Sequence, residues 1–355
     1  MKMTFRRFDL HLRHSWAIAT DVQGERVTGK STYPVVIVEL TDAHGRAGIG
    51  EGSPSSQYQE SWETCFEFLH QVNPERLRFD DLSGSLEYLE AVKPGRYPAK
   101  CAINLALLDG AARAAKLPIC EFLGLGAFTE RRHLSSFTIG LDSPAMIERK
   151  VLEAAAYPVL KMKMGSPCDA ENLAALRRAA PTKTIRVDAN AAWKTKEIAL
   201  QQLEWLAQDG RVEFVEQPMP AETPTADLAW LRERSPLPLV GDESYQSAAD
   251  VEKCADAYHG VNVKLVKTGG LTAGKAALET ARRHGLKTML GCMIESSILI
   301  TAAAHLAALT DWLDLDGNAL IDNDPYTGVQ TENGWLSFDG VALQHGLRVT
   351  PRNKL

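Results

Sequence analysis

The sequence predicts an α/β fold in which a modified TIM barrel of the (β/α)7β type carries an α+β capping domain at its N-terminus. From about residue 133 onwards, eight short β-rich runs alternate with seven amphipathic helical segments, which favours a closed barrel of parallel strands. The 355 residues suffice for one barrel of roughly 200–250 residues and a smaller unit. An open doubly wound sheet is the alternative, but it would normally show a glycine-rich phosphate loop after an early strand, and the sequence has none.

The predicted capping domain covers residues 1–125 and is completed by the tail 325–355. Its first part has the composition of β structure, with strands expected at 35–40 and 47–51. The spacing of apolar residues then becomes helical, and it predicts helices at 61–72, 82–91 and 100–115. No low-complexity linker follows, so we expect the two units to pack closely.

The predicted barrel covers residues 126–324. Its strands are expected at 135–141, 159–164, 184–189, 212–217, 238–243, 260–265, 287–293 and 312–317. Amphipathic helices intervene, for example at 170–180, 197–208, 248–257 and 273–284. The strand interiors are apolar and their last turns are charged. Because the C-terminal ends of barrel strands form the active site in such folds, these charged ends are the first functional candidates.

Composition narrows the class of protein. The formal net charge of −6, with dispersed Lys and Arg, argues against a nucleic-acid partner. No apolar run approaches about 18 residues and the first residues lack an apolar signal core, so neither a membrane span nor a leader is expected. The six cysteines include no CxxC pair, which suits reduced thiols better than disulfides or a zinc site. We therefore expect a cytoplasmic protein that acts on a small molecule.

Three carboxylates stand at the ends of three consecutive predicted strands: Asp188, Glu216 and Asp242. Taken singly, an aspartate after a strand is more often a helix N-cap. Together the three converge on the barrel mouth, where buried charge is costly unless it is paired or binds an ion. Three carboxylate oxygens are typical of a hard divalent cation such as Mg²⁺, and the lack of His or Cys among them disfavours zinc.

Two lysines, Lys163 and Lys264, end the second and sixth predicted strands and would face each other across the barrel mouth. A free lysine has a pKa near ~10.4, but a divalent cation, desolvation and a neighbouring ammonium such as Lys161 would lower it. The alternatives are a salt bridge for Lys264, or the same role for Lys267, which is more naturally placed in the loop.

Such a set suits chemistry at the α-carbon of a carboxylate. Removal of the α-proton builds a dianionic enediolate, which a divalent cation and the ammonium of Lys161 would stabilise. Bases on opposite faces would let one lysine remove the proton and the other return it. The sequence therefore predicts an epimerase or a racemase.

The ordered residues and several motifs resemble the enolase superfamily. GIGEGSP and CAINLALLDGAARAAKLPICEFLG are similar to its capping domain, and NVKLVKTGGLT and GCMIESSI to its sixth and seventh barrel strands. KxK on the second strand and a single lysine on the sixth resemble the muconate-lactonizing enzyme subgroup. That subgroup includes o-succinylbenzoate synthases, N-succinylamino acid racemases and dipeptide epimerases. The resemblance covers nearly the whole chain and implies a cap over the barrel mouth; such barrels often form homo-oligomers.

The resemblance also implies a role for each member of the set. The three carboxylates would hold one Mg²⁺ per subunit, and Lys163 and Lys264 would be the acid/base pair. Lys161 would be the cation beside the substrate carboxylate. Asn190 and Glu243 would support the metal ligands.

Asp314 and Asp316 narrow the prediction within this subgroup. Residues one apart on a strand point to the same face, and a substrate ammonium is the natural partner because other acids already supply the metal site. The same DxD resembles dipeptide epimerases, in which it holds the free amino terminus while the α-carbon of the C-terminal residue is inverted by 1,1-proton transfer. Turn or helix-capping aspartates are the alternative, and the second DxD at 322–324 is expected to be a turn.

Specificity residues are harder to identify. Arg26 and Glu51 in the capping domain, and Glu295 and Ser296 on the seventh strand, are expected to contact the substrate. Arg26 would suit an acidic residue of the substrate, whereas Glu51 or Asp21 would suit a cationic or polar one. Between these alternatives, L-Ala-D/L-Glu and similar dipeptides are the favoured substrates. An N-succinylamino acid racemase or o-succinylbenzoate synthase would use the same lysines and metal, but would have little use for the DxD. A non-catalytic binding barrel is the remote alternative.

Overall fold

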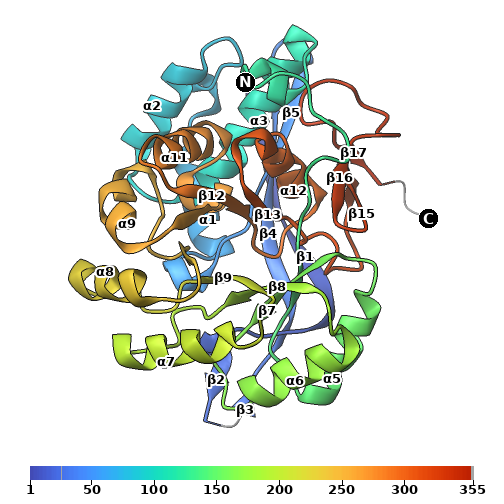
Figure 1. Cartoon of the computed structure of the whole chain (residues 1–355). Coiled ribbons are helices and arrows are strands. Elements are labelled where there is room, and N and C mark those ends of the chain that lie inside the picture. Colours follow the sequence, from blue (N-terminus) through green and yellow to red (C-terminus); the bar gives the residue numbers. More distant parts are fainter. Residues whose placement is uncertain (25, 353–355) are drawn as a thin grey trace.

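The computed structural model describes residues 1–24 and 26–352, and it has the predicted architecture of an eight-stranded parallel barrel with an N-terminal α+β unit (Figure 1). The N-terminal sheet is antiparallel and contains β1 (Lys2–Trp16), β4 (Lys30–Thr41) and β5 (Ala47–Gly52), in the order β1-β4-β5. The strands predicted at 35–40 and 47–51 lie within β4 and β5. Between β1 and β4, the short strands β2 (Val22–Gln23) and β3 (Arg26–Val27) pair with each other.

Helix α3 (Tyr97–Ala115) packs on this sheet and is almost entirely buried. Its close approach depends on the alternating glycines of β5. A Cβ atom on each would collide with a carbonyl oxygen of α3: Gly48 with Ala106, Gly50 with Ala102 and Gly52 with Pro98. The glycines of the GIGEG motif are therefore explained by the close packing of α3 on β5. Helices α1 (Trp62–Gln71), α2 (Leu82–Val92) and α4 (Ile119–Phe122) complete the unit, and α1, α2 and α3 confirm the three predicted helices.

The barrel strands follow one another in sequence order around a single parallel sheet. They are β6 (Phe137–Ile139), β7 (Val159–Lys163), β8 (Thr184–Asp188), β9 (Val212–Glu216), β10 (Leu239–Gly241), β11 (Gly260–Val263), β12 (Lys287–Gly291) and β13 (Trp312–Asp314). All eight predicted strands are confirmed. The two edges meet where Ser136 N donates to Leu313 O at 3.1 Å. Because β7 and β11 are four strands apart, their C-terminal ends face each other across the mouth.

The helices between these strands carry an apolar face toward the barrel. They are α5 (Pro144–Glu153), α6 (Asp169–Ala179), α7 (Lys196–Ala207), α8 (Thr225–Arg234), α9 (Val251–Ala257), α11 (Leu271–Arg283) and α12 (Ser297–Ala304), with the short α10 (Leu265–Thr268) directly after β11. In α11 the buried residues recur every three or four positions, at Leu271, Gly274, Leu278 and Ala281 among others. This periodicity is what made the helices recognisable in the sequence.

The C-terminal segment, red in Figure 1, returns to the N-terminal unit. It contains β14 (Tyr326–Thr327), β15 (Gln330–Glu332), β16 (Trp335–Ser337) and β17 (Thr350–Pro351). The buried carboxylate of Asp109, on α3, accepts hydrogen bonds from Ile49 N at 3.0 Å and from Leu347 N at 2.8 Å. One side chain thus joins β5, α3 and the tail.

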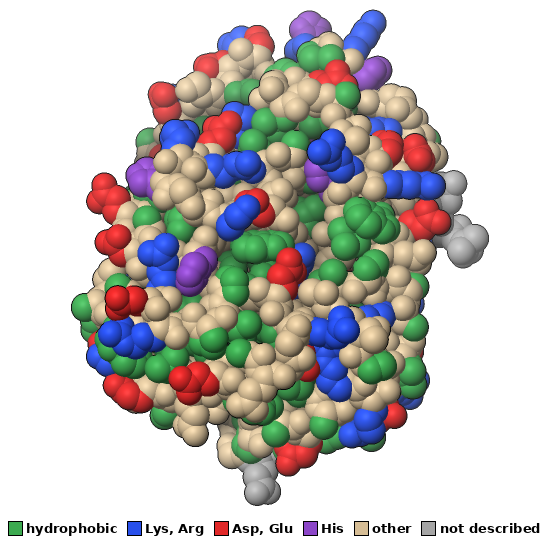
Figure 2. All heavy atoms as spheres, viewed as in Figure 1, with side chains coloured by type: hydrophobic (Ala, Val, Ile, Leu, Met, Phe, Trp, Pro, Cys, Tyr) green, Lys and Arg blue, Asp and Glu red, His purple; other side chains and the backbone are tan. Residues whose placement is uncertain are grey.

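The surface carries charges of both signs. Figure 2 shows Lys and Arg interspersed with Asp and Glu over one face of the molecule. Within residues 1–24 and 26–352, no helix has the length and apolar character needed to cross a membrane.

Candidate active site

Three buried carboxylates meet at the barrel mouth. Asp188 and Glu216 are the last residues of β8 and β9, and Asp242 directly follows β10. One oxygen from each lies within 4.8 Å of the others. They converge because neighbouring parallel strands are paired in register, with Asp188 opposite Glu216.

The carboxylates strongly perturb one another. Burial opposes ionisation of Asp188, but Lys163 and Lys161 outweigh it and lower its pKa to about 2. Burial, followed by the negative charge of Asp188, raises the pKa of Glu216 to about 7. Glu216 Oε2 is buried and lies 2.8 Å from Lys161 Nζ, yet it forms no hydrogen bond with any described residue. An oxygen-only set with one oxygen left without a hydrogen bond fits a hard divalent cation.

Lys163 and Lys264 approach these carboxylates from opposite sides. Lys163 Nζ donates to Asp188 Oδ2 at 2.6 Å, and Lys264 Nζ donates to Asp242 Oδ2 at 2.7 Å. Burial alone would lower the pKa of Lys264, but the adjacent Asp242 outweighs it and raises that pKa. While these pairs persist, Lys264 is held protonated and both lysines act as hydrogen-bond donors.

Lys161 lies at the centre of the acidic cluster. Its Nζ is 2.8 Å from Asp314 Oδ2, 2.8 Å from Glu216 Oε2 and 3.0 Å from Asp188 Oδ2. Burial opposes its charge, but these carboxylates raise the pKa of Lys161 well above its usual value. Lys161 is therefore a fixed cation.

Lys267 lies in α10 and serves as a buried counter-ion. Its Nζ is within 2.6 Å of both Asp242 Oδ1 and Asp242 O, and within 3.0 Å of Tyr245 O and Asn262 O. The side chain is inaccessible to solvent. With four oxygen acceptors around its ammonium, Lys267 holds the loop after β10 and is not exposed to a substrate.

Two side-chain amides, those of Asn262 and Gln217, hold the metal-site carboxylates in position, and neither was predicted from the sequence. Asn262 Nδ2 donates to Glu216 Oε1 at 2.9 Å. Gln217 Oε1 accepts from Asp242 N at 2.9 Å and from Ser244 N at 3.2 Å. Asn262 could have been found, because it precedes Lys264 by two residues and so shares its face of the strand. Gln217 has a φ of 38°, a backbone conformation that the sequence does not reveal.

Asn190 and Glu243 lie beside the metal-site carboxylates and reach the cap. Asn190 N donates to Asp188 Oδ1 at 2.9 Å, and Asn190 Nδ2 donates to Glu243 Oε1 at 3.3 Å. Gln57 Nε2, from the N-terminal unit, donates to the same Glu243 oxygen at 2.6 Å. Burial and the charge of Asp242 raise the pKa of Glu243 to about 7.

Asp314 and Asp316 differ in their surroundings. Asp314 Oδ2 accepts from Lys161, and its Oδ1 accepts from Ser136 Oγ at 2.7 Å. Asp316 Oδ2 accepts from Thr138 N at 2.5 Å, whereas its Oδ1 has, among the described residues, only a thiol as donor, that of Cys292 at 3.7 Å. Burial and the neighbouring Asp314 raise the pKa of Asp316 to about 7. Asp314 is thus already paired with a cation, and Asp316 is the carboxylate with capacity left.

A cavity of about 80 Å³ lies over this cluster, between the barrel and the N-terminal unit. The barrel contributes Lys161, Lys163, Lys264, Asn190, Asp314 and Asp316 to its lining. The N-terminal unit contributes residues that include Trp16, Tyr33, Ser53 and Gln57. A molecule bound in this cavity would therefore lie among Lys163, Lys264, Asp314 and Asp316.

The four residues expected to set specificity lie outside this lining. Ser296, the N-cap of α12, donates to the buried Glu51 from both its backbone N and its Oγ, which joins β5 to the barrel. Glu295 is buried and accepts from Met293 N at 3.0 Å. Arg26 is exposed on β3. In the described part of the chain, Glu51 and Ser296 thus have a role in packing the two units together.

Comparison with known proteins places the chain among enzymes of this architecture. Residues 145–339 match the family described as "Enolase C-terminal domain-like", and residues 16–124 match the N-terminal domain of the mandelate racemase / muconate lactonizing enzyme family. An L-Ala-D/L-amino acid epimerase from Pedosphaera parvula is 54% identical over 349 residues, which cover 98% of this chain and 99% of the relative. An L-Ala-D/L-Glu epimerase from Bacteroides thetaiotaomicron is 36% identical, over 96% of this chain and 86% of the relative.

Solved structures share the fold over nearly the full length. The L-Ala-D/L-Glu epimerase from Bacillus subtilis, in a substrate-liganded complex, has a TM-score of 0.89 at 24% identity and covers 99% of this chain and 98% of its own. The dipeptide epimerase from Enterococcus faecalis, complexed with Mg and L-Leu-L-Tyr, has a TM-score of 0.86 at 26% identity, with 98% of each chain covered. With its two matched domains and its full-length relatives, this chain belongs to the mandelate racemase / muconate lactonizing enzyme family of the enolase superfamily.

Proposed function

We propose that the protein is a Mg²⁺-dependent dipeptide epimerase, which inverts the α-carbon of the C-terminal residue by 1,1-proton transfer through an enediolate. The observation that carries this proposal is the shared cavity. Lys163 and Lys264 reach it from opposite strands of the barrel, and Asp316 lines the same space. A substrate with both a carboxylate and an ammonium matches these groups.

The two lysines would act on opposite faces of the α-carbon. One takes the α-proton as a base while the other, protonated, delivers a proton to the other face, and the roles exchange for the opposite stereoisomer. Lys161 stays protonated among its carboxylates and stabilises negative charge on the substrate carboxylate as it develops. Because each face of the α-carbon is served by a different lysine, the reaction inverts the configuration rather than only exchanging the α-proton with solvent.

Asp188, Glu216 and Asp242 would hold one Mg²⁺ per subunit. When bound, Mg²⁺ would supply Lewis-acid stabilisation of the charge that builds on the substrate carboxylate. Carboxylates that balance a divalent cation attract the neighbouring ammonium groups less. Lys163 and Lys264 would therefore be released from Asp188 and Asp242, and the pKa of Lys264 would fall toward the range of a useful base.

The amino terminus of the substrate would meet Asp316. Asp314 already pairs with Lys161, so its part is to orient that lysine while Asp316 accepts the substrate ammonium. An N-acylated substrate has no such cation and would leave Asp316 buried without a positive partner. This favours a free dipeptide over an N-succinylamino acid. The relative at 54% identity is named for L-Ala at the first position, so L-Ala-D/L-Glu and similar dipeptides are the substrates to test first.

The test is proton NMR in D₂O with Mg²⁺, using L-Ala-L-Glu, L-Ala-D-Glu and N-succinyl-L-Glu. We expect both dipeptides to lose the α-proton signal of the C-terminal residue, with the diastereomer appearing. The N-succinylamino acid should remain unexchanged. Turnover of N-succinyl-L-Glu with no exchange of any dipeptide would contradict the proposal and identify an N-acylamino acid racemase.

A further inference from the structure

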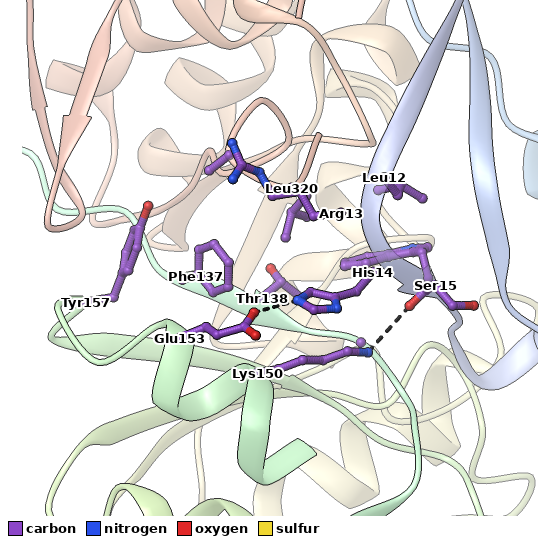
Figure 3. A pocket seen from close by; sticks show the side chains of 13 residues that line it. Leu12, Arg13, His14, Ser15, Phe137, Thr138, Lys150, Glu153, Tyr157 and Leu320 are labelled. Carbon is purple, nitrogen blue, oxygen red and sulfur yellow. Dashed lines mark hydrogen bonds and ion pairs between the residues drawn. The ribbon is translucent and has the colours of Figure 1, made fainter. Parts of the chain in front are cut away.

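A second cavity adjoins the first, beside β6. It has a volume of about 190 Å³ and is bounded by the end of β1, by β6, by α5 and by residues 319–320 (Figure 3). Trp16, Thr138 and Leu320 line both cavities. The second cavity is therefore separated from the active site by a single layer of side chains.

Thr138 joins this layer to the proposed ammonium site. Its backbone N donates to Asp316 Oδ2 at 2.5 Å, and its Oγ1 donates to Asp314 Oδ1 at 3.3 Å. Tyr157 lines the second cavity near the same aspartate: burial raises the pKa of Tyr157, and the charge of Asp316 raises it further. A substrate ammonium bound to Asp316 would thus lie beside the layer of side chains that separates the two cavities. The Cα atom that carries this ammonium also carries the side chain of the amino-terminal residue, so that side chain would begin beside the same layer.

The floor of the second cavity is aromatic. The rings of Phe137 and Tyr157 lie 4.6 Å apart between centroids, at an interplanar angle of 42°. Leu12 and Leu320 add aliphatic surface, and Trp16 forms part of the wall toward the active site. Figure 3 shows the Phe137 and Tyr157 rings on the left of the cavity, on the side away from His14 and Ser15 of β1. Such a lining gains most from an apolar occupant, because that occupant is removed from water.

Most of the charged side chains around this cavity are already paired. His14 Nε2 lies 2.6 Å from Glu153 Oε2, and Lys150 Nζ donates to Ser15 O at 3.4 Å (Figure 3). Lys150 Nζ also donates to Asp142 Oδ2 at 2.9 Å. A cationic occupant would have to break these contacts to gain a partner, and the remaining charged lining residue, Arg13, donates from its Nε to the backbone oxygen of Ile321 at 2.9 Å. The pairs also anchor the end of β1 to α5, which holds the adjacent Trp16 in place.

Trp16 is the partition between the two cavities. A Cβ atom at Gly140 would lie 3.2 Å from Trp16 Cε3, so the absence of a side chain there lets the ring pack close to the backbone after β6. Lys163 Nζ is 6.0 Å from the centroid of the Trp16 ring. Trp16 and Leu320 line both cavities, so a side chain that extends from Asp316 into the second cavity would have to displace one of these two side chains.

We infer that this second cavity receives the side chain of the substrate's amino-terminal residue, and that it accepts large apolar or aromatic side chains there. The inference rests on the proposed function and adds a specificity site to it. It assigns Phe137, Tyr157 and Ala319 to substrate selection, although they lie outside the cavity that holds the acid/base lysines.

The experiment fills the cavity without touching the catalytic groups. Ala319 is half-buried and lines the second cavity alone, so Ala319→Phe places a ring inside it. The matched control is Ala308→Phe, the same change at an exposed position that lines a different cavity. Both variants and the parent protein are assayed by α-proton exchange with L-Ala-L-Glu, L-Leu-L-Glu and L-Phe-L-Glu.

We expect the parent protein to exchange all three dipeptides. Ala319→Phe should lower kcat/KM about ten-fold or more for L-Phe-L-Glu and L-Leu-L-Glu, with L-Ala-L-Glu changed by less than about two-fold. Ala308→Phe should change none. If Ala319→Phe does not fold, Tyr157→Ala removes part of the floor and should lower kcat/KM for L-Phe-L-Glu selectively.

Two outcomes would overturn the inference. One is an equal effect of Ala319→Phe or Tyr157→Ala on all three dipeptides, or no effect at all. The other is exchange of L-Ala-L-Glu by the parent protein with no exchange of the two bulkier dipeptides. Failure of all three dipeptides would instead refute the proposed function.

Discussion

Replacing Lys267 with methionine tests whether this lysine is a buried counter-ion of Asp242 or an acid/base group of the reaction. Its ammonium lies 2.6 Å from Asp242 Oδ1 and also meets three backbone carbonyls, and its side chain is inaccessible to solvent. Removing one partner of a buried ion pair typically costs about 3–5 kcal/mol. Lys264 still pairs with the other oxygen of Asp242, so we expect a loss near the lower end, about 3 kcal/mol.

The measurement is urea unfolding at equilibrium in the presence of EDTA, which keeps divalent cations from contributing to stability. The matched control is Lys275→Met. Lys275 forms a partly exposed i,i+4 pair with Glu279 at 2.7 Å, and its removal should cost no more than about 0.5 kcal/mol. The slope of free energy against urea should stay unchanged in both variants.

The reasoning would fail if Lys267→Met lost less than about 1 kcal/mol, the upper limit for a surface pair. It would also fail if the variant kept its stability but lost α-proton exchange from only one stereoisomer of the substrate. That result would identify Lys267, in place of Lys264, as the base on that face.

Three further predictions concern the lysine pair, the ammonium site and pH. We expect epimerisation to be abolished in Lys163→Ala and in Lys264→Ala, with kcat falling about 10²–10⁴-fold. Each variant should retain α-proton exchange with one stereoisomer of the substrate only. Loss of exchange from both stereoisomers in both variants would contradict the assignment of two separate bases. Asp316→Asn should raise KM for L-Ala-L-Glu more than it lowers kcat, because it removes the charge that meets the substrate ammonium, and steady-state kinetics would show the reverse if Asp316 acted on the reacting carbon. Burial raises the pKa of Glu51 from 4.5 to about 7. Between these two pH values Glu51 keeps its proton in the folded protein but loses it in the unfolded chain. The stability that protonated Glu51 contributes is therefore fully present below pH 4.5 and is lost as the pH rises to 7. Glu51→Gln should remove this loss, up to about 3 kcal/mol, and unfolding at pH 5 and pH 8 measures it; an identical pH dependence in both proteins would show that the native pKa is ordinary.

The order of elements was available from the sequence because local chemistry repeats along the chain. Buried parallel strands are short apolar runs, and helices such as α11 place apolar residues every three or four positions. Several strands ended in a charged residue, so Asp188, Glu216 and Asp242 could be assigned to one edge without any knowledge of distances. Parallel strands then bring those ends together, and the observed separation of at most 4.8 Å follows from that topology.

The tertiary structure decided which groups touch. Glu51 and Ser296 are 245 residues apart and form a contact between the two units, whereas the sequence suggested that each met the substrate. Asp314 and Asp316 have the same residue type and the same strand face, yet only Asp314 reaches Lys161. Such differences depend on side-chain placement across the barrel to within an ångström, which local patterns do not encode.

By itself, the sequence determined the fold class, the strands and helices, and the chemical character of the barrel mouth, because these depend on residue type and periodicity along the chain. Only the tertiary structure decided how the charges are shared, where Lys267 and Gln217 act, and that a second, aromatic cavity lies behind Trp16. The physical reason is that charge pairing and cavity shape depend on distances between residues far apart in the chain, and those distances exist only once the barrel has closed and the cap has packed on it.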